Sequence, residues 1–147
     1  MFGPHDRLVR YTFGDPLCAQ AILRAVLPPR LDERIDWSTL RRESPLVVDS
    51  RLRETQSDLL FSARQGSGHP RLFYFLLEHQ SRVDKEMAQR IFDYVCRFYE
   101  RWRREHSTVR ERSVVIPLVL YHGTRGAWTA PCRFEDTFAW ADDELEF

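Results

Sequence analysis

The chain has 147 residues, of which 43% are hydrophobic, 13% aromatic and 30% charged, and its formal net charge is zero. This length suits one domain with a real core and is too short for two typical domains. The composition excludes a disordered chain, and the zero net charge gives no overall sign of nucleic-acid binding.

The first predicted element is a helix that begins at Asp15-Pro16. Aspartate is a favoured N-cap residue and proline is favoured at the first helical position. The helix has an apolar stripe made of Ala19, Ile22, Leu23 and Val26. Pro28-Pro29 is expected to end it. Residues 30–45 are polar and punctuated, which predicts a loop or a short helix, with Asp36-Trp37-Ser38 as an N-terminal cap and aromatic anchor.

Three strands are predicted next, at residues 45–52 (PLVVDSRL), 57–65 (SDLLFSARQ) and 71–81 (RLFYFLLEHQS). The turn sequence QGSGHP separates the second from the third and predicts a β-hairpin. The third strand is apolar almost throughout, which is typical of a strand that is buried on both faces in the middle of a sheet.

A long helix and a fourth strand complete the predicted domain. After Asp84 the apolar residues recur at helical spacing over about five turns, namely Met87, Ile91, Tyr94, Val95, Phe98 and Trp102. Residues 113–123 (SVVIPLVLYHG) form the fourth strand, in which Pro117 predicts an edge position or a bulge. The order of elements predicts an α/β fold with a mixed four-stranded sheet flanked by helices.

The charges divide the chain into two parts. All 22 basic residues lie at or before Arg133, whereas only sixteen of the 22 acidic residues do, so residues 1–134 carry a net charge of +6. Residues 1–134 are therefore the predicted domain, and 135–147 are an acidic C-terminal segment with no closing element, a pattern typical of a truncated chain. Lys85 is the only lysine; arginine suits phosphate oxygens, but genomic base composition explains the bias equally well.

Three cysteines, Cys18, Cys96 and Cys132, lie far apart and form no CxxC pair, so we interpret them as reduced core thiols rather than zinc ligands. The amino terminus lacks the apolar stretch of a signal peptide, and no apolar run is long enough to cross a bilayer. These features predict a cytoplasmic protein without membrane contact. The sequence does not fix the oligomeric state.

Two carboxylates are predicted to face each other across the hairpin. If the turn is centred near residue 67 or 68, Asp58 lies opposite Glu78, and Gln80 shares the face of Glu78 because side chains alternate along a strand. Two buried carboxylates repel each other, and a bound cation offsets this repulsion. Oxygen ligands select Mg²⁺ or Mn²⁺. The alternative is structural: each acid merely marks a strand end and meets water or an arginine, and a one-residue slip would turn Glu78 away.

The sequence also resembles a known family. Asp58 followed by Glu78-His79-Gln80 is similar to the D…ExK signature of PD-(D/E)XK nucleases, with glutamine in the place of the commoner lysine. The wider chain resembles the Rpn family of recombination-promoting nucleases, also called YhgA-like transposases. The stretches that carry this resemblance cover most of the chain: HDRLVRYTFGDP, IDWSTL, SDLLFSAR, FYFLLEHQS, MAQRIFDYV and PLVLYHGTRGAW.

The resemblance implies a restriction-endonuclease-like core and a Mg²⁺-dependent DNA endonuclease linked to recombination and transposition. It implies that Asp58 and Glu78 bind the metal, that the backbone carbonyl of His79 adds a ligand, and that Gln80 orients the attacking water. An amide does not stabilise charge as an ammonium does, so Gln80 puts the activity in question. The alternative is an inactive nuclease-fold module that binds DNA or protein.

Further residues have accessory interpretations. Glu54 lies four positions before Asp58 and is a candidate accessory ligand. Arg90 and Tyr94 resemble the QxxxY helix motif of some nucleases in this superfamily; Arg90 would contact a phosphate, whereas core packing explains Tyr94 equally well. The His79 side chain is expected on the face opposite Glu78, where it makes a structural hydrogen bond.

Overall fold

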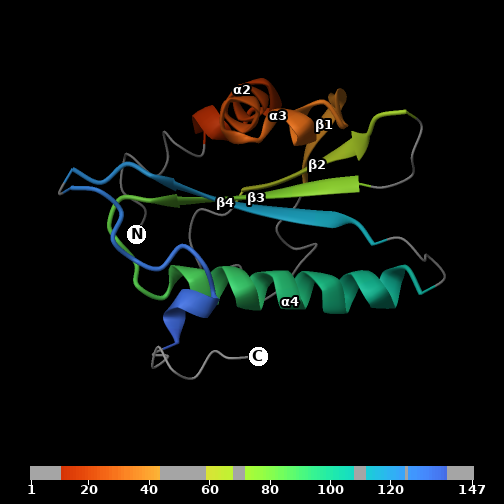
Figure 1. Cartoon of the computed structure of the whole chain (residues 1–147). Helices are drawn as coiled ribbons and strands as arrows, with labels where there is room; N and C mark the ends of the chain where they lie inside the picture. Colours follow the sequence, from red (N-terminus) through yellow and green to blue (C-terminus); the bar gives the residue numbers. More distant parts are fainter. Residues whose placement is uncertain (1–10, 44–58, 68–71, 108–111, 125, 139–147) are drawn as a thin grey trace.

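A mixed four-stranded sheet with helices on both faces forms the protein in the computed structural model, which describes residues 11–43, 59–67, 72–107, 112–124 and 126–138 (Figure 1). The strands are β1 (Ile35–Glu43), β2 (Leu59–Gln65), β3 (Leu72–Gln80) and β4 (Val114–Tyr121), and they lie in chain order across the sheet. β1, β2 and β3 pair antiparallel, whereas β4 pairs parallel to β3. The predicted α/β class is confirmed, and the arrangement is consistent with a restriction-endonuclease-like core.

Helix α2 (Pro16–Val26) begins where the sequence predicts. Asp15 is the N-cap, and its Oδ1 accepts hydrogen bonds from the backbone N–H groups of Leu17 at 2.8 Å and Cys18 at 3.3 Å. The face toward the sheet carries Ala19, Leu23 and Leu27, which are all buried. The predicted inward position of Val26 is wrong, because the buried positions recur every four residues and Val26 lies off that line, 56% exposed. The short helix α3 (Pro29–Asp32) follows.

The sheet buries both of its faces. On one face, Phe61, Phe75 and other odd-numbered residues of β2 and β3 pack against α2, which lies above the sheet in Figure 1. On the other face, Leu60, Tyr74 and Leu76 pack against the long helix α4 (Met87–Glu105) through Tyr94, Phe98 and Trp102. The prediction that β3 lies in the middle of a covered sheet is confirmed, and even-numbered residues of β3 therefore face α4.

Strand β1 corrects one prediction. Residues 35–43 are a strand and not the predicted loop or short helix, and Asp36-Trp37-Ser38 is part of it rather than a helix cap. The Trp37 ring stacks on Phe75 with centroids 5.9 Å apart, so β1 contributes to the core. β1 is an edge strand of the described sheet, and its register with β2 shifts between Asp36 and Arg41. The strand predicted at 45–52 lies outside the described residues.

The β2–β3 register and the helix that precedes β4 agree with the predictions made from the sequence. The residue numbers of each β2–β3 pair add up to 136, from Leu59↔Leu77 to Arg64↔Leu72, as the predicted hairpin requires. Helix α4 then connects β3 to the parallel strand β4, and its bounds match the predicted helix. Pro117 lies in β4, which pairs only with β3 within the described residues, so the predicted edge position is confirmed there.

The three cysteines lie at the surface of the described structure. The expectation that the cysteines lie in the core is wrong: Cys18, Cys96 and Cys132 are all exposed and none forms a disulfide. Beyond β4, a 3-10 helix, η3 (Glu135–Thr137), lies close to α4, and Phe134 just before it stacks on Phe92 with centroids 4.0 Å apart. None of the helices in the described ranges has the length and apolarity needed to cross a membrane.

Candidate active site

A buried carboxylate marks the C-terminal end of β3 on the face toward α4. Glu78 is only 2% exposed, although β3 is otherwise apolar from Leu72 to Leu77. Because side chains alternate along a strand, Gln80 lies on the same face, at the point where β3 leaves the core. The sheet therefore delivers a carboxylate and an amide together at its rim, as the sequence predicts.

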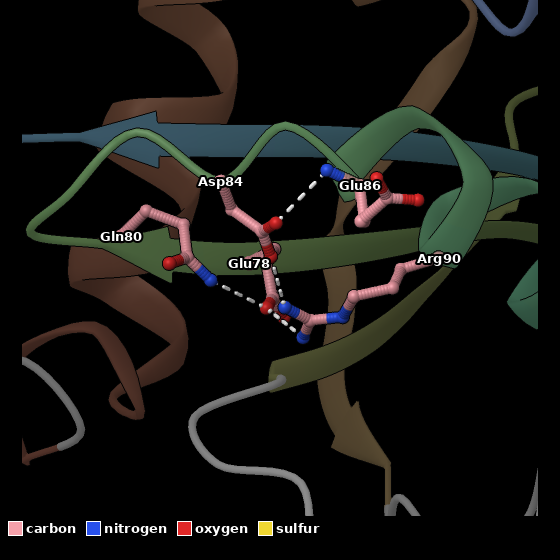
Figure 2. Close-up of polar contacts among 5 residues, drawn as sticks. All are labelled: Glu78, Gln80, Asp84, Glu86 and Arg90. Carbon is pink, nitrogen blue, oxygen red and sulfur yellow. Dashed lines mark hydrogen bonds and ion pairs between the residues drawn. The ribbon is translucent and has the colours of Figure 1, made fainter. Parts of the chain in front are cut away.

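Two side chains hold the Glu78 carboxylate in place (Figure 2). The Gln80 amide donates from Nε2 to Glu78 Oε1 at 2.9 Å, and the Arg90 guanidinium donates from Nη2 to the same oxygen at 2.6 Å. The positive charge beside Glu78 is thus the guanidinium of Arg90, as in the structural alternative of the sequence analysis, in which Glu78 meets an arginine; the bound cation stays a prediction.

Arg90 bridges two carboxylates. Its Nη1 donates to Asp84 Oδ2 at 2.8 Å while Nη2 contacts Glu78. Asp84 is itself fixed, because its Oδ1 accepts the backbone N–H of Glu86 at 2.9 Å in the turn that leads into α4. Arg90 then lies in the first turn of α4 and reaches back to the strand end. Spacing alone did not predict this bridge, because it depends on the path of the 81–86 turn.

Tyr94 lies one turn beyond Arg90 and has the same orientation toward the sheet. It is 5% exposed, and its hydroxyl has no hydrogen-bond partner among the described residues. A buried hydroxyl without a partner typically costs 1–3 kcal/mol. The tyrosine ring packs in the core beneath α4, so the core role considered for Tyr94 is confirmed, and the unpartnered hydroxyl is a separate feature.

Burial dominates the protonation of this site. It raises the pKa of the Glu78 carboxyl, and the nearby charge of Arg90 together with the hydrogen bonds from Gln80 and Arg90 only partly offsets this effect. Burial also raises the pKa of the Tyr94 hydroxyl, with a smaller contribution from the charge of Glu78. A second negative charge beside the Glu78 carboxylate is therefore unfavourable unless further positive charge is supplied.

The Glu78 carboxyl should make stability fall as pH rises. Its native pKa lies above the ordinary 4.5, so between these two values the native state binds more protons than the unfolded state, and the free energy of unfolding declines with pH. The slope contributed by Glu78 is at most about 1.4 kcal/mol per pH unit. Urea unfolding of wild type and Glu78→Gln across this range should show the wild-type curve falling relative to the variant.

The matched control for this measurement is Glu100→Gln. Glu100 pairs with Arg104 on the outer side of α4, and its side chain is 56% exposed, so its replacement should leave the pH dependence unchanged. Parallel curves for wild type and Glu78→Gln would contradict the burial argument for Glu78.

The other predicted site residues have mixed outcomes. Asp58 and Glu54 lie outside the described residues, so their assignment as ligands stays a prediction; the hairpin register that favours it is confirmed up to Leu59↔Leu77. The His79 side chain stacks on His122, with ring centroids 4.3 Å apart, at the ends of β3 and β4. It lies on the face opposite Glu78, as predicted. The metal-binding role of the His79 carbonyl remains a prediction.

The described residues supply part of an oxygen ligand set. Glu78 offers a carboxylate, and Gln80 retains its amide oxygen because the hydrogen bond to Glu78 uses the NH₂ group. In the part of the chain that the structure describes, no group of three or more His, Cys, Asp or Glu side chains forms a ready metal cluster. Mg²⁺ needs only one or two protein carboxylates and keeps several waters, so these donors fit Mg²⁺ with Asp58 as the predicted second carboxylate.

Comparison with known proteins adds an independent line of evidence. Residues 3–146 match the family described as "Putative transposase, YhgA-like". The chain is 36% identical over 138 residues to the recombination-promoting nuclease RpnD of Escherichia coli O157:H7, and 32% identical over 136 residues to RpnA of strain K12. It is 29% identical over 135 residues to the inactive recombination-promoting nuclease-like protein RpnE of strain K12.

Each of these alignments covers 92% of this chain but only 52%, 46% and 44% of RpnD, RpnA and RpnE, respectively. The chain thus spans about half the length of the curated relatives it matches. No solved structure matches it.

Proposed function

Because this chain belongs to the YhgA-like transposase family, we propose that it is a divalent-metal-dependent DNA endonuclease that acts in recombination. Two of its relatives are named recombination-promoting nucleases. The observation that carries the proposal is the buried Glu78 carboxylate, held with Gln80 at the rim of the central sheet. A carboxylate buried at this cost at the end of a strand is typical of a functional site.

The proposed ligands are Glu78, Asp58 and the backbone carbonyl of His79. All three offer the hard oxygen atoms that Mg²⁺ and Mn²⁺ prefer. When bound, such an ion would lower the pKa of a coordinated water and offset the negative charge of a DNA phosphate. Gln80 would orient the attacking water through its amide, which is already fixed beside Glu78 at 2.9 Å.

Arginines on the face of the sheet that carries Glu78 provide a surface for the DNA backbone. Arg41 and Arg64 line a polar cavity of about 780 Å³ between β1 and β2, together with Ser67 and Gln65. Contacts of this kind hold phosphates without reading bases, so DNA binding should weaken steeply as the salt concentration rises.

Metal removal is the direct test of this proposal. Wild-type protein should nick supercoiled plasmid in Mg²⁺ or Mn²⁺ and should stop when EDTA is added. Asp58→Ala and Glu78→Ala should each lower the rate at least about tenfold, because the metal supplies several kcal/mol of transition-state stabilisation. Glu100→Ala, on the outer side of α4, serves as the control. Equal nicking by all four proteins, or nicking that persists in EDTA, would refute the proposed site.

A second candidate function is an inactive nuclease-fold module that binds DNA or protein. Two observations favour it: Arg90 already neutralises Glu78, and glutamine occupies the position where lysine is commoner. The relative RpnE is named inactive. Isothermal titration separates the two functions, because an inactive module should take up no Mg²⁺ that depends on Glu78.

A further inference from the structure

We propose that Arg90 is a displaceable internal cation: it occupies Glu78 while the site is empty, and it moves to a DNA phosphate when the metal binds. This inference rests on the proposed nuclease function and names the residue that couples metal binding to DNA binding. It follows from four observations on the end of β3 and the first turn of α4.

The first observation is the position of the guanidinium. Arg90 Nη2 lies 2.6 Å from Glu78 Oε1, and the Glu78 side chain is only 3% exposed. A divalent ion held by this carboxylate would lie within a few ångströms of the guanidinium. Like charges at such distances repel strongly where water does not screen them. Metal binding at Glu78 therefore disfavours the present position of Arg90.

The second observation is that Arg90 has another partner and room to move. Its Nη1 is held by Asp84 Oδ2 at 2.8 Å, and the Arg90 and Asp84 side chains are 39% and 28% exposed. If Nη2 leaves Glu78, Asp84 keeps the guanidinium at the edge of the site. The freed N–H groups would then be available to a phosphate at the rim of the sheet, because the Arg90 side chain is already 39% exposed. Arginine matches the geometry of phosphate oxygens.

The third observation is the rigid anchor of Asp84. Its second oxygen accepts the backbone N–H of Glu86 at 2.9 Å, so the carboxylate does not need to move when Arg90 shifts (Figure 2). Asp84 would act as the pivot of the arginine, and only the contact with Glu78 would break.

The fourth observation is independent of Arg90. The Tyr94 hydroxyl is buried, lies one helical turn away, and has no partner among the described residues. Buried polar groups are normally hydrogen-bonded, so the Tyr94 hydroxyl is a donor that still needs an acceptor beside the candidate site. A water held by the metal, or a phosphate oxygen, would supply that acceptor.

The inference predicts opposite effects of one substitution. In Arg90→Gln, the metal no longer competes with a guanidinium, so Mg²⁺ should bind about fivefold more tightly, a factor at the lower end of typical coupling between sites. DNA should bind about tenfold more weakly in the presence of a divalent ion, because a phosphate contact is lost. Without divalent ions, Arg90 stays on Glu78, and the substitution should change DNA affinity by less than about twofold.

Mg²⁺ affinity is measured from the Mg²⁺ concentration at half-maximal thermal stabilisation, at about pH 8.5 so that protonation of carboxyls does not compete. DNA affinity is measured with a labelled duplex in Ca²⁺, which takes the same type of oxygen ligands, and again in EDTA. Arg104→Gln is the control: Arg104 pairs with Glu100 in the last turn of the same helix, so its replacement should leave Mg²⁺ affinity unchanged. Arg90→Lys keeps the positive charge but loses the planar guanidinium that binds two oxygens at once. It should shift the Mg²⁺ and DNA affinities in the same directions as Arg90→Gln, by smaller factors.

The outcomes separate this inference from the proposed function. If Mg²⁺ stabilises neither wild type nor Arg90→Gln, Glu78 holds no metal and both proposals are overturned. If Mg²⁺ stabilises wild type but binds Arg90→Gln and Arg90→Lys with equal or lower affinity, the proposed function stands and the displacement of Arg90 is refuted. A loss of DNA affinity that is the same in Ca²⁺ and EDTA would also refute it.

Discussion

Phe75→Ala should lower the free energy of unfolding by about 4 kcal/mol, as expected for removing a fully buried aromatic ring. Phe75 is 0% exposed at the centre of β3, and its ring stacks on Trp37 of the edge strand β1. The cavity left by the substitution would lie between the sheet and α2, next to the Trp37 ring. Because domains are typically stable by 5–15 kcal/mol, this loss is a large part of the total.

Urea unfolding followed by circular dichroism measures this loss, with Phe92→Ala as the matched control. Phe92 is also a phenylalanine but is 42% exposed on α4, where it stacks on Phe134. Its replacement should cost about 1 kcal/mol, the scale of an aromatic pair. Equal losses for the two variants would show that the β3 core is not the main source of stability.

Gln80→Lys should raise the rate of Mg²⁺-dependent nicking about a hundredfold, the scale of one well-placed charge-stabilising donor. The Gln80 amide lies 2.9 Å from Glu78 Oε1, so a lysine at this position would place its ammonium in the same region of the site. An ammonium stabilises developing negative charge and still orients water, whereas an amide only orients it. The substitution also restores the residue that is commoner in the nuclease signature that the sequence resembles.

Single-turnover nicking of plasmid measures this gain, and Gln89→Lys controls for the added charge. Gln89 lies in the first turn of α4 and donates to Asp93 at 2.9 Å, away from Glu78. A lysine there should strengthen non-specific DNA binding without changing the chemical step. A nicking rate unchanged by Gln80→Lys would indicate that position 80 does not contact the reacting groups.

The central elements of the fold could be predicted because their sequence signals are local and strong. The apolar run of β3, the turn after β2 and the helical spacing of α4 each indicate one structure, and the turn places the β2–β3 register to within one residue of the observed one. The register then brings Glu78 and Gln80 to one face. Alternation along a strand is a geometric rule that needs no tertiary information.

Strand β1 could not be predicted because its pattern is weak. It lies at an edge of the described sheet, it is mostly half-exposed, and its register shifts between Asp36 and Arg41, which interrupts the alternation of polar and apolar residues. The exposed cysteines were misjudged for a related reason. Cysteine is usually buried, but Cys18 and Cys96 fall on the outer faces of their helices.

Only the part of the site that lies on β3 could be predicted from the sequence. The strand positions of Glu78 and Gln80 follow from alternation, whereas the Arg90 bridge depends on how the 81–86 turn places α4 over the sheet. The sequence left two partners open for Glu78, a bound metal or an arginine, and spacing alone could not choose between them. The structure shows that an arginine twelve positions later is the partner in the present state.

The polar network of Glu78, Gln80, Asp84 and Arg90 has a consequence for how this family diversifies. All four residues lie on one strand end, one turn and one helical turn, while the hydrophobic contacts that hold the domain together come mainly from other positions. On the proposed function, point changes in this short stretch would alter cutting while leaving the two hydrophobic clusters of the domain in place. A single lineage could hold both cutting and silent proteins on nearly the same scaffold.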